Sequence, residues 1–170
     1  YSCMNNYMIR IYCIRILRQF AIANAARKPM PPALNCTAAA LCASERHSFL
    51  VVDGAVYAWG EQTGGKLGFE SETSVRTPAL VDALSSVVVS TVAAGISHSV
   101  ALASDGRLFT WGSAQYGCTG RGVKSKSTVH SPEVPPTLQG ISFSLIAAGG
   151  WHTMAVTADS GELYTWGYGG

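Results

Sequence analysis

Short runs in which apolar and polar residues alternate recur along the chain after residue 44. One of them begins at His98 and reads HSVALASDGRLFTWG. Alternate side chains of a strand lie on opposite faces, which places His98, Val100 and Leu102 together on one face. The dipeptide Asp105-Gly106 then supplies the backbone conformation that a tight turn needs. The run therefore predicts a β-hairpin that ends at Trp111.

This hairpin pattern occurs three times. Similar runs, HSFLVVDGAVYAWG and HTMAVTADSGELYTWG, begin at His47 and His152. A repeat of roughly 50 residues with several short strands is typical of a β-propeller, in which each repeat forms about one blade. The recurring residues are His47, His98 and His152, Trp59, Trp111 and Trp166, and the turn glycines Gly54, Gly106 and Gly161.

Both faces of these strands carry few charges and many small residues, so neighbouring sheets must cover them on both sides. We therefore expect an all-β chain that forms a partial β-propeller, about two and a half blades of a seven-bladed one. A flexible or helical leader over residues 1–40 would precede it, and residues 41–170 would hold the repeats. The units would span about 41–90, 91–143 and 144–170. Because propellers close with about 4 to 8 blades, we expect this chain to be a fragment of a longer protein.

The repeat resembles that of the regulator of chromosome condensation family. That repeat has Gly-x-x-His-Ser/Thr, a short hairpin, and then Trp-Gly-x-x-x-x-Gly-x-Leu-Gly. The middle unit carries the pattern through Gly95, His98, Ser99, Asp105, Gly106, Trp111, Gly112, Gly117 and Gly120. Two positions depart from it, because Thr119 replaces the leucine and Ser44 replaces the first unit's glycine. Kelch propellers share the period, but the glycine doublets of this chain do not occupy equivalent places in its units.

A residue type that recurs at the same place in every unit indicates architecture, because an active site needs its acid or base only once. We expect the three histidines to be buried groups that hydrogen-bond to a neighbouring carbonyl or hydroxyl. The three tryptophans would pack between blades, with each indole N–H bound to an acceptor. We find no pattern for a catalytic, cofactor or metal site, so the chain is not expected to be an enzyme.

Two loop motifs suggest other chemistry. GEQTGGKL, residues 60–67, fits the first seven positions of a phosphate-binding loop, but Leu67 replaces the residue that would bind magnesium. No helix is predicted after it, so we assign the motif to the repeat. The polar loop RGVKSK contains Arg121, Lys124 and Lys126, which would contact an acidic partner or phosphate if the loop is more than a solvated connection.

The opening segment has a different composition. All ten acidic residues lie at Glu45 or beyond, whereas residues 1–44 hold five basic residues and none that is acidic. This composition is typical of a mitochondrial transit peptide, although an artefact of gene modelling would also explain it. Arginines interrupt its apolar stretch, so no membrane span is expected. The five cysteines have no paired spacing that indicates zinc or a disulfide framework.

Two functions remain open at this stage. The first is a protein-interaction propeller in mitochondria, where it would regulate a GTPase or assist RNA processing or ribosome assembly. The second is a guanine-nucleotide exchange factor or chromatin-associated protein of the nucleus or cytosol, which the resemblance implies because the founding member acts on a small nuclear GTPase. Both require a protein partner, and whether nucleic acid binds stays undecided.

Overall fold

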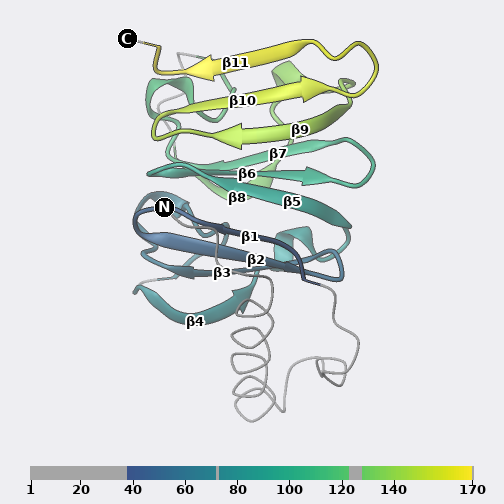
Figure 1. The fold of residues 1–170 in the computed structure, drawn as a ribbon. Helices are drawn as coiled ribbons and strands as arrows, with labels where there is room; N and C mark the ends of the chain where they lie inside the picture. Colours follow the sequence, from purple (N-terminus) through teal and green to yellow (C-terminus); the bar gives the residue numbers. More distant parts are fainter. Residues whose placement is uncertain (1–37, 72, 123–127, 170) are drawn as a thin grey trace, which may run out of the picture. The chain divides into compact units, whose positions relative to one another are not determined.

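The computed structural model describes residues 38–71, 73–122 and 128–169. The predicted leader lies outside these residues except for its last three positions. The described chain folds into three antiparallel sheets joined by loops and single turns of 3₁₀ helix (Figure 1). The all-β prediction is confirmed.

The first sheet has the order β1-β2-β3-β4, with each strand next to its neighbour in the sequence. Its strands are β1 (Ala38–Ala43), β2 (His47–Val52), β3 (Ala55–Gly60) and β4 (Val75–Leu80). The second sheet repeats this order with β5 (Val89–Ala94), β6 (His98–Ala103), β7 (Leu108–Gly112) and β8 (Val129–Glu133). The third has three described strands, β9 (Phe143–Ala148), β10 (His152–Thr157) and β11 (Leu163–Gly167).

Each predicted hairpin forms in the same register. His47 is paired with Gly60, His98 with Gly112 and His152 with Gly167. These three glycines have positive φ values of 116°, 100° and 112°. A Cβ atom on Gly112 would lie 2.5 Å from the carbonyl oxygen of Ser97, so the chain can leave the hairpin here only through glycine.

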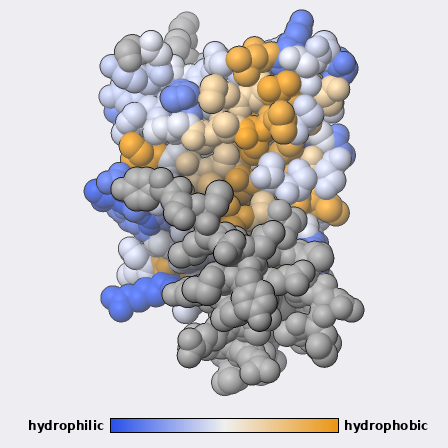
Figure 2. All heavy atoms as spheres, viewed as in Figure 1, coloured by the Kyte–Doolittle hydropathy of each residue, from blue (hydrophilic) through white to orange (hydrophobic). Residues whose placement is uncertain are grey.

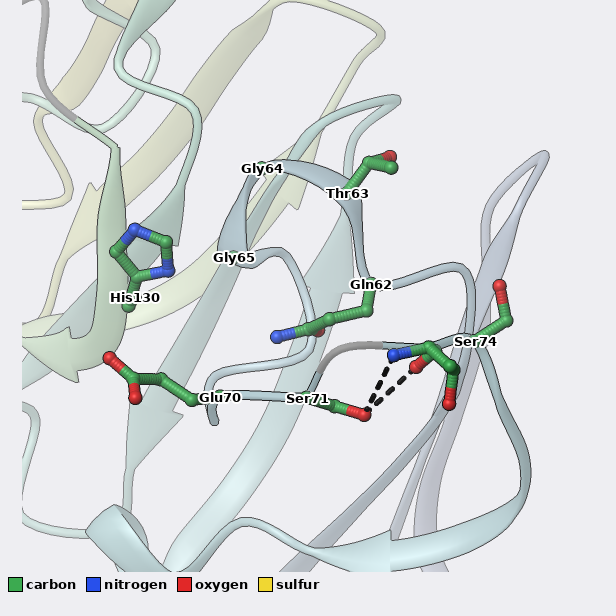
Figure 3. Close-up of a pocket in the computed structure, with 9 residues that line it drawn as sticks. Gln62, Thr63, Gly64, Gly65, Glu70, Ser71, Ser74 and His130 are labelled. Carbon is green, nitrogen blue, oxygen red and sulfur yellow. Dashed lines mark hydrogen bonds between the residues drawn. The ribbon is translucent and has the colours of Figure 1, made fainter.

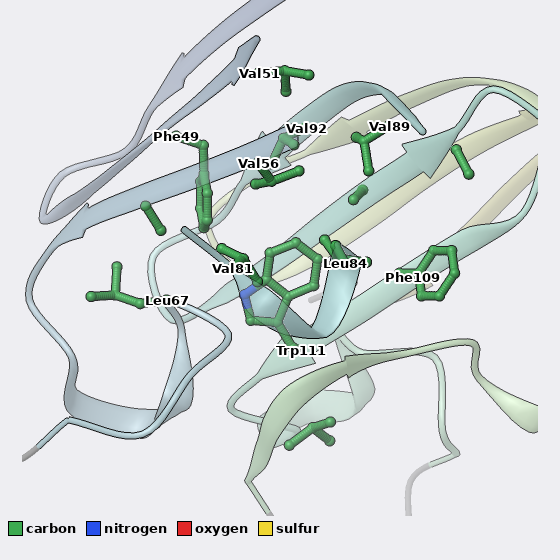
Figure 4. Packing of buried hydrophobic residues seen from close by; sticks show 14 residues of the cluster. Phe49, Val51, Val56, Leu67, Val81, Leu84, Val89, Val92, Phe109 and Trp111 are labelled. Carbon is green, nitrogen blue, oxygen red and sulfur yellow. The ribbon is translucent and has the colours of Figure 1, made fainter. Parts of the chain in front are cut away.

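The sheets stack face to face, with the middle sheet between the other two (Figure 1). Strand β6 is buried along its whole length. Its Ala101 and Ala103 pack toward the first sheet, in a cluster with Phe49 and Trp111 (Figure 4). Its Val100 and Leu102 pack toward the third sheet. The alternation predicted for this run is confirmed.

The first strands of the second and third sheets are also close to each other, since β5 contacts β9, and β5 contacts β2 of the first sheet as well. Figure 2 shows apolar residues gathered over this part of the molecule. No helix among the described residues is long and apolar enough to cross a membrane.

Candidate functional site: inter-sheet contacts and the loop end

The repeated histidines lie where one sheet meets the next. His47 and His98 are 2% and 0% exposed, whereas His152 on the third sheet is exposed. The Nε2 atom of His47 lies 3.0 Å from the hydroxyl of Ser99 in the second sheet. The Nε2 atom of His98 lies 2.9 Å from the hydroxyl of Thr153 in the third sheet. The same contact therefore joins each pair of neighbouring sheets.

Each of these hydroxyls also donates a hydrogen bond. The Ser99 hydroxyl donates to the carbonyl of Lys66 at 2.8 Å, and the Thr153 hydroxyl donates to the carbonyl of Cys118 at 2.9 Å. A hydroxyl has one proton to donate, so its oxygen must accept the proton on histidine Nε2. This assigns the neutral Nε2–H tautomer to His47 and His98.

The same carbonyls accept a second hydrogen bond from tryptophan. The indole of Trp111 donates to the Lys66 carbonyl, and that of Trp166 donates to the Cys118 carbonyl, both at 2.9 Å. Trp59 of the first sheet is half-buried and lacks such a bond within the described part of the chain. We call the set of histidine, hydroxyl, carbonyl and indole the inter-sheet relay; it occurs twice.

The two relays differ at the other nitrogen of the imidazole. The Ser44 hydroxyl lies 2.7 Å from Nδ1 of His47. The second relay has Gly95 at this position, and Nδ1 of His98 is buried without a hydrogen-bond partner among the described residues. A Cβ atom on Gly95 would lie 2.4 Å from that Nδ1 atom. Ser44, the departure from the family pattern, therefore completes the first relay.

Burial lowers the pKa of both histidines to about 4. For His47 the nearby charge of Lys66 adds to this effect, and for His98 that of His152 does so. Both imidazoles are therefore neutral near pH 7, and a buried neutral imidazole has no access to a substrate. The geometry suits a structural contact between sheets rather than acid–base catalysis.

The turn glycines lie at the other end of the hairpins. Gly54, Gly106 and Gly161 have φ values of 80°, 87° and 70°. The carbonyl of Gly54 accepts a hydrogen bond from Val89, and that of Gly106 accepts one from Phe143. The Gly54 and Gly106 turns thus each bind the first strand of the next sheet. Their structural role, like that of the histidines and tryptophans, stays our proposal.

The loop that resembles a phosphate-binding motif has a different structure. Residues Thr63–Gly65 form one 3₁₀ turn, η1, in place of the start of an α-helix. Lys66 is 4% exposed, and its ammonium lies 3.3 Å from the Glu61 carboxylate. Hydrogen bonds from Thr63, then Lys66 and Arg46, lower the pKa of Glu61 to about 2. The lysine that would bind phosphate is therefore paired within the protein.

Beside this loop is a cleft of about 540 Å³ that sequence reasoning missed (Figure 3). Gln62 lines one wall and His130 of β8 lies opposite, with Glu70 on the same side as His130 (Figure 3). Hydroxyl side chains line the rest, Thr63, Ser71, Thr73 and Ser74. The only sequence signal was the polar stretch ESETS. Among the described residues no group of three or more His, Cys, Asp and Glu could hold a metal ion.

The basic loop is only partly described. The guanidinium of Arg121 lies 2.8 Å from the Glu133 carboxylate, and the Arg121 side chain is 16% exposed. Lys124 and Lys126 lie outside the described residues. The prediction that this loop contacts a partner is therefore untested.

A second feature that sequence reasoning missed is a group of three aromatic rings at the histidine end of the third sheet. The ring of Tyr116, from the turn η3 (Gln115–Gly117), lies 5.5 Å from that of Trp151 and 5.0 Å from that of Tyr168. Trp151 directly precedes β10 and Tyr168 directly follows β11. Their separation in sequence concealed the group, which only the folded chain brings together.

Comparison with known proteins decides the family. The regulator of chromosome condensation (RCC1) repeat matches residues 53–102 and 105–156, more than half of the chain, and a second form of that repeat matches residues 89–118 and 143–170. The chain belongs to the RCC1 repeat family. Its three sheets are accordingly consecutive blades of a β-propeller.

Two curated relatives illustrate the range of RCC1 proteins. The chain is 41% identical to human E3 ubiquitin-protein ligase HERC2 over 132 residues, which cover 76% of the chain and 3% of HERC2. It is 40% identical to the RCC1 domain-containing protein RUG3, mitochondrial, of Arabidopsis thaliana over 121 residues, 71% of the chain and 26% of RUG3. The chain thus spans at most about a quarter of these relatives.

A solved RCC1 structure has the same fold. Prp20p from Saccharomyces cerevisiae superposes with a TM-score of 0.66 and 27% identity, over 76% of this chain and 33% of Prp20p. Its crystal structure was described together with its binding to Gsp1p and histones.

Proposed function

We propose that this RCC1 chain is a non-catalytic protein-interaction module that acts in mitochondria, where it regulates a GTPase or assists RNA processing or ribosome assembly. The observation that carries the proposal is the contrast between the recurring side chains of the blades and the loops that connect the strands. At the two boundaries between the described sheets, His47, His98, Trp111 and Trp166 are occupied in bonds between sheets. The loops at the histidine end, in contrast, differ from blade to blade. An architecture that recurs from blade to blade and carries different loops is suited to binding proteins.

The relatives support parts of this proposal. RUG3 carries the word mitochondrial in its name, in agreement with the acid-free leader of this chain. HERC2 is a ligase, but the match covers only 3% of it, so we do not transfer its activity. We retain residues 1–40 as leader and about 41–90, 91–143 and 144–170 as the three units.

A second candidate is a guanine-nucleotide exchange factor or chromatin-associated protein of the nucleus or cytosol. The similarity to Prp20p, which binds Gsp1p and histones, favours it. It requires the leader to have no targeting role, because a mitochondrial protein would not meet nuclear chromatin.

The site of action can be tested with the leader alone. Residues 1–44 are fused to a fluorescent protein, and a matched fusion replaces the basic residues Arg10, Arg15 and Arg18 by glutamine. We expect the first fusion in mitochondria and the second in the cytosol. A cytosolic location of both fusions would contradict the mitochondrial proposal.

The biochemical activity can be tested on the full chain. A partner is identified by proximity labelling in cells, and its binding to the purified 170-residue chain is then measured by calorimetry. Nucleotide release from small GTPases, with and without the chain, is measured in parallel. Saturable binding without accelerated release supports the interaction module, accelerated release supports the exchange factor, and the absence of a binding partner contradicts both.

A further inference from the structure

The ends of the three hairpins have the same backbone but different side chains. In each blade the residue after Trp-Gly donates its N–H to the carbonyl of the residue before the histidine. This bond is 2.9 Å long in all three, from Glu61 to Arg46, from Ser113 to Ser97 and from Tyr168 to Trp151. The blades therefore present in turn an ion pair, two hydroxyls and two aromatic rings at one structural position.

The turn before each blade boundary shows the same contrast. In the first blade the turn contains Gly64 with a φ of 73°, and a Cβ atom there would lie 3.9 Å from Cβ of Ser113. In the second blade Tyr116 occupies the equivalent position with a φ of 58°. A bulky residue at positive φ is strained, and such strain concentrates at functional positions. The turn itself does not require a tyrosine at this position, since glycine occupies it in the first blade.

The three rings, which we call the aromatic patch, are also open to binding. Tyr116 and Tyr168 are 50% and 53% exposed, and Trp151 is half-buried. Unlike the indoles of Trp111 and Trp166, the indole N–H of Trp151 has no hydrogen-bond partner within the described part of the chain. The hydroxyls of the two tyrosines have none there either. Tyr and Trp dominate binding energy at protein interfaces, where an apolar body and a polar tip are both used.

The surroundings indicate what kind of segment would bind. Six residues adjoin the patch in sequence: His152, and the uncharged residues Gln115, Gly117, Gly150, Gly167 and Gly169. None of these six residues has a carboxylate, ammonium or guanidinium group to hold a charged ligand. A run of proline residues has no charged side chain, is already extended as polyproline II, and has no internal hydrogen bonds, so its carbonyls are free to accept. The patch offers apolar rings together with three unpaired donors, which match such a segment.

We propose that the aromatic patch of Tyr116, Trp151 and Tyr168 is a docking site for an uncharged, proline-rich extended segment of a partner protein. The rings pack against the proline faces, and the tyrosine hydroxyls and the indole N–H donate to carbonyls of the segment. This site rests on the proposed interaction function and adds a place and a partner chemistry to it.

The test uses the full chain and a synthetic decaproline peptide, with a Gly-Ser decapeptide as control. Calorimetry should show saturable binding of decaproline with a dissociation constant below about 1 mM, and none of the control. Tyr116→Gly and Trp151→Ser install the residues of the other blades, and each should weaken binding at least tenfold. Val88→Ser removes an apolar side chain that is 64% exposed, beside the Gly54 turn at the opposite end, and should leave binding unchanged.

Several results would overturn the docking site. They are an absence of decaproline binding, equal binding by Tyr116→Gly and Trp151→Ser, or tighter binding of an arginine-rich or glutamate-rich decapeptide. Amide proton protection of each variant is compared with the parent chain, so that a loss of fold is recognised. If the partner found by proximity labelling still binds Tyr116→Gly and Trp151→Ser with unchanged affinity, the docking site is wrong while the interaction function stands.

Discussion

At the scale of single residues, one hydroxyl per boundary connects two blades. The hydroxyl of Ser99 accepts from His47 and donates to the Lys66 carbonyl, and that of Thr153 does the same for His98 and the Cys118 carbonyl. Recurrence in the sequence predicted that the histidines bind a carbonyl or hydroxyl. It did not identify the acceptor, because Ser99 lies one blade further along the chain and only the stacking of sheets brings it to His47.

Removing this hydroxyl should destabilise the fold. Ser99→Ala leaves the buried Nε2–H of His47 without an acceptor, and we expect the free energy of unfolding to fall by about 2 kcal/mol. Ser90→Ala is the matched control, because the Ser90 hydroxyl donates to the carbonyl of Leu102 from an exposed position. Urea titration should show a change of less than about 1 kcal/mol for the control. Equal losses in the two variants would show that the relay hydroxyl stabilises the fold no more than an exposed serine does.

At Thr119, where the family pattern has leucine, we expect a substitution to raise the free energy of unfolding. Thr119 is fully buried and its hydroxyl has no hydrogen-bond partner among the described residues. Thr119→Val removes that unpaired hydroxyl and should raise the free energy of unfolding by about 1 kcal/mol. The neighbouring Thr110→Val should lower it, since the Thr110 hydroxyl donates to the Thr119 carbonyl at 2.8 Å. Thermal unfolding measures both, and a destabilised Thr119→Val would contradict this assignment.

At the scale of elements, the hairpins were predictable and the outer strands were not. Alternation and the Asp-Gly turns indicated β2–β3 and β6–β7, because both signals are local. The outer strands β4 and β8 have no clear alternation and contain Pro78 and Pro132. Proline is tolerated there because a strand at a sheet edge has free N–H positions. The aromatic patch was likewise hidden, since its rings come from three separate segments.

The exit of each hairpin gives a test at this scale. Gly112→Ala forces a Cβ atom to within 2.5 Å of the Ser97 carbonyl at a φ of 100°, so we expect a loss of about 3 kcal/mol or more. Gly117→Ala has a φ of 74° but open space around its Cβ position, and should lose only about 1 to 2 kcal/mol. Denaturant unfolding compares the two. Similar losses would mean that the positive φ alone, and not the nearness of the Ser97 carbonyl, requires glycine at position 112.

At the scale of the whole molecule, the blades are joined through buried neutral imidazoles, which makes stability depend on pH. An unfolded histidine takes up a proton near pH 6.5, whereas His47 and His98 in the folded chain do so only near pH 4. The unfolded state therefore binds more protons as the pH falls between these values. Stability is then constant above about pH 6.5 and decreases toward pH 4.

The size of this effect can be measured. Each buried histidine should lower the free energy of unfolding by on the order of 3 kcal/mol between pH 6.5 and pH 4. His98→Gln removes one of the two groups and should reduce the slope of stability against pH by about half, although the variant is less stable than the parent chain near pH 7. Urea midpoints from pH 7.5 to pH 4.5 would reveal this. An unchanged slope in His98→Gln would contradict burial of a neutral imidazole.

The relay itself is tested most directly by NMR of the imidazole nitrogens in the ¹⁵N-labelled full chain. The account predicts that His47 and His98 are in the neutral Nε2–H form at pH 7 and remain so to about pH 5, because burial lowers their pKa to about 4. Loss of the two signals in His47→Gln and His98→Gln assigns them. If both imidazoles instead titrate near pH 6.5, or carry their proton on Nδ1, the histidines do not join the blades as described.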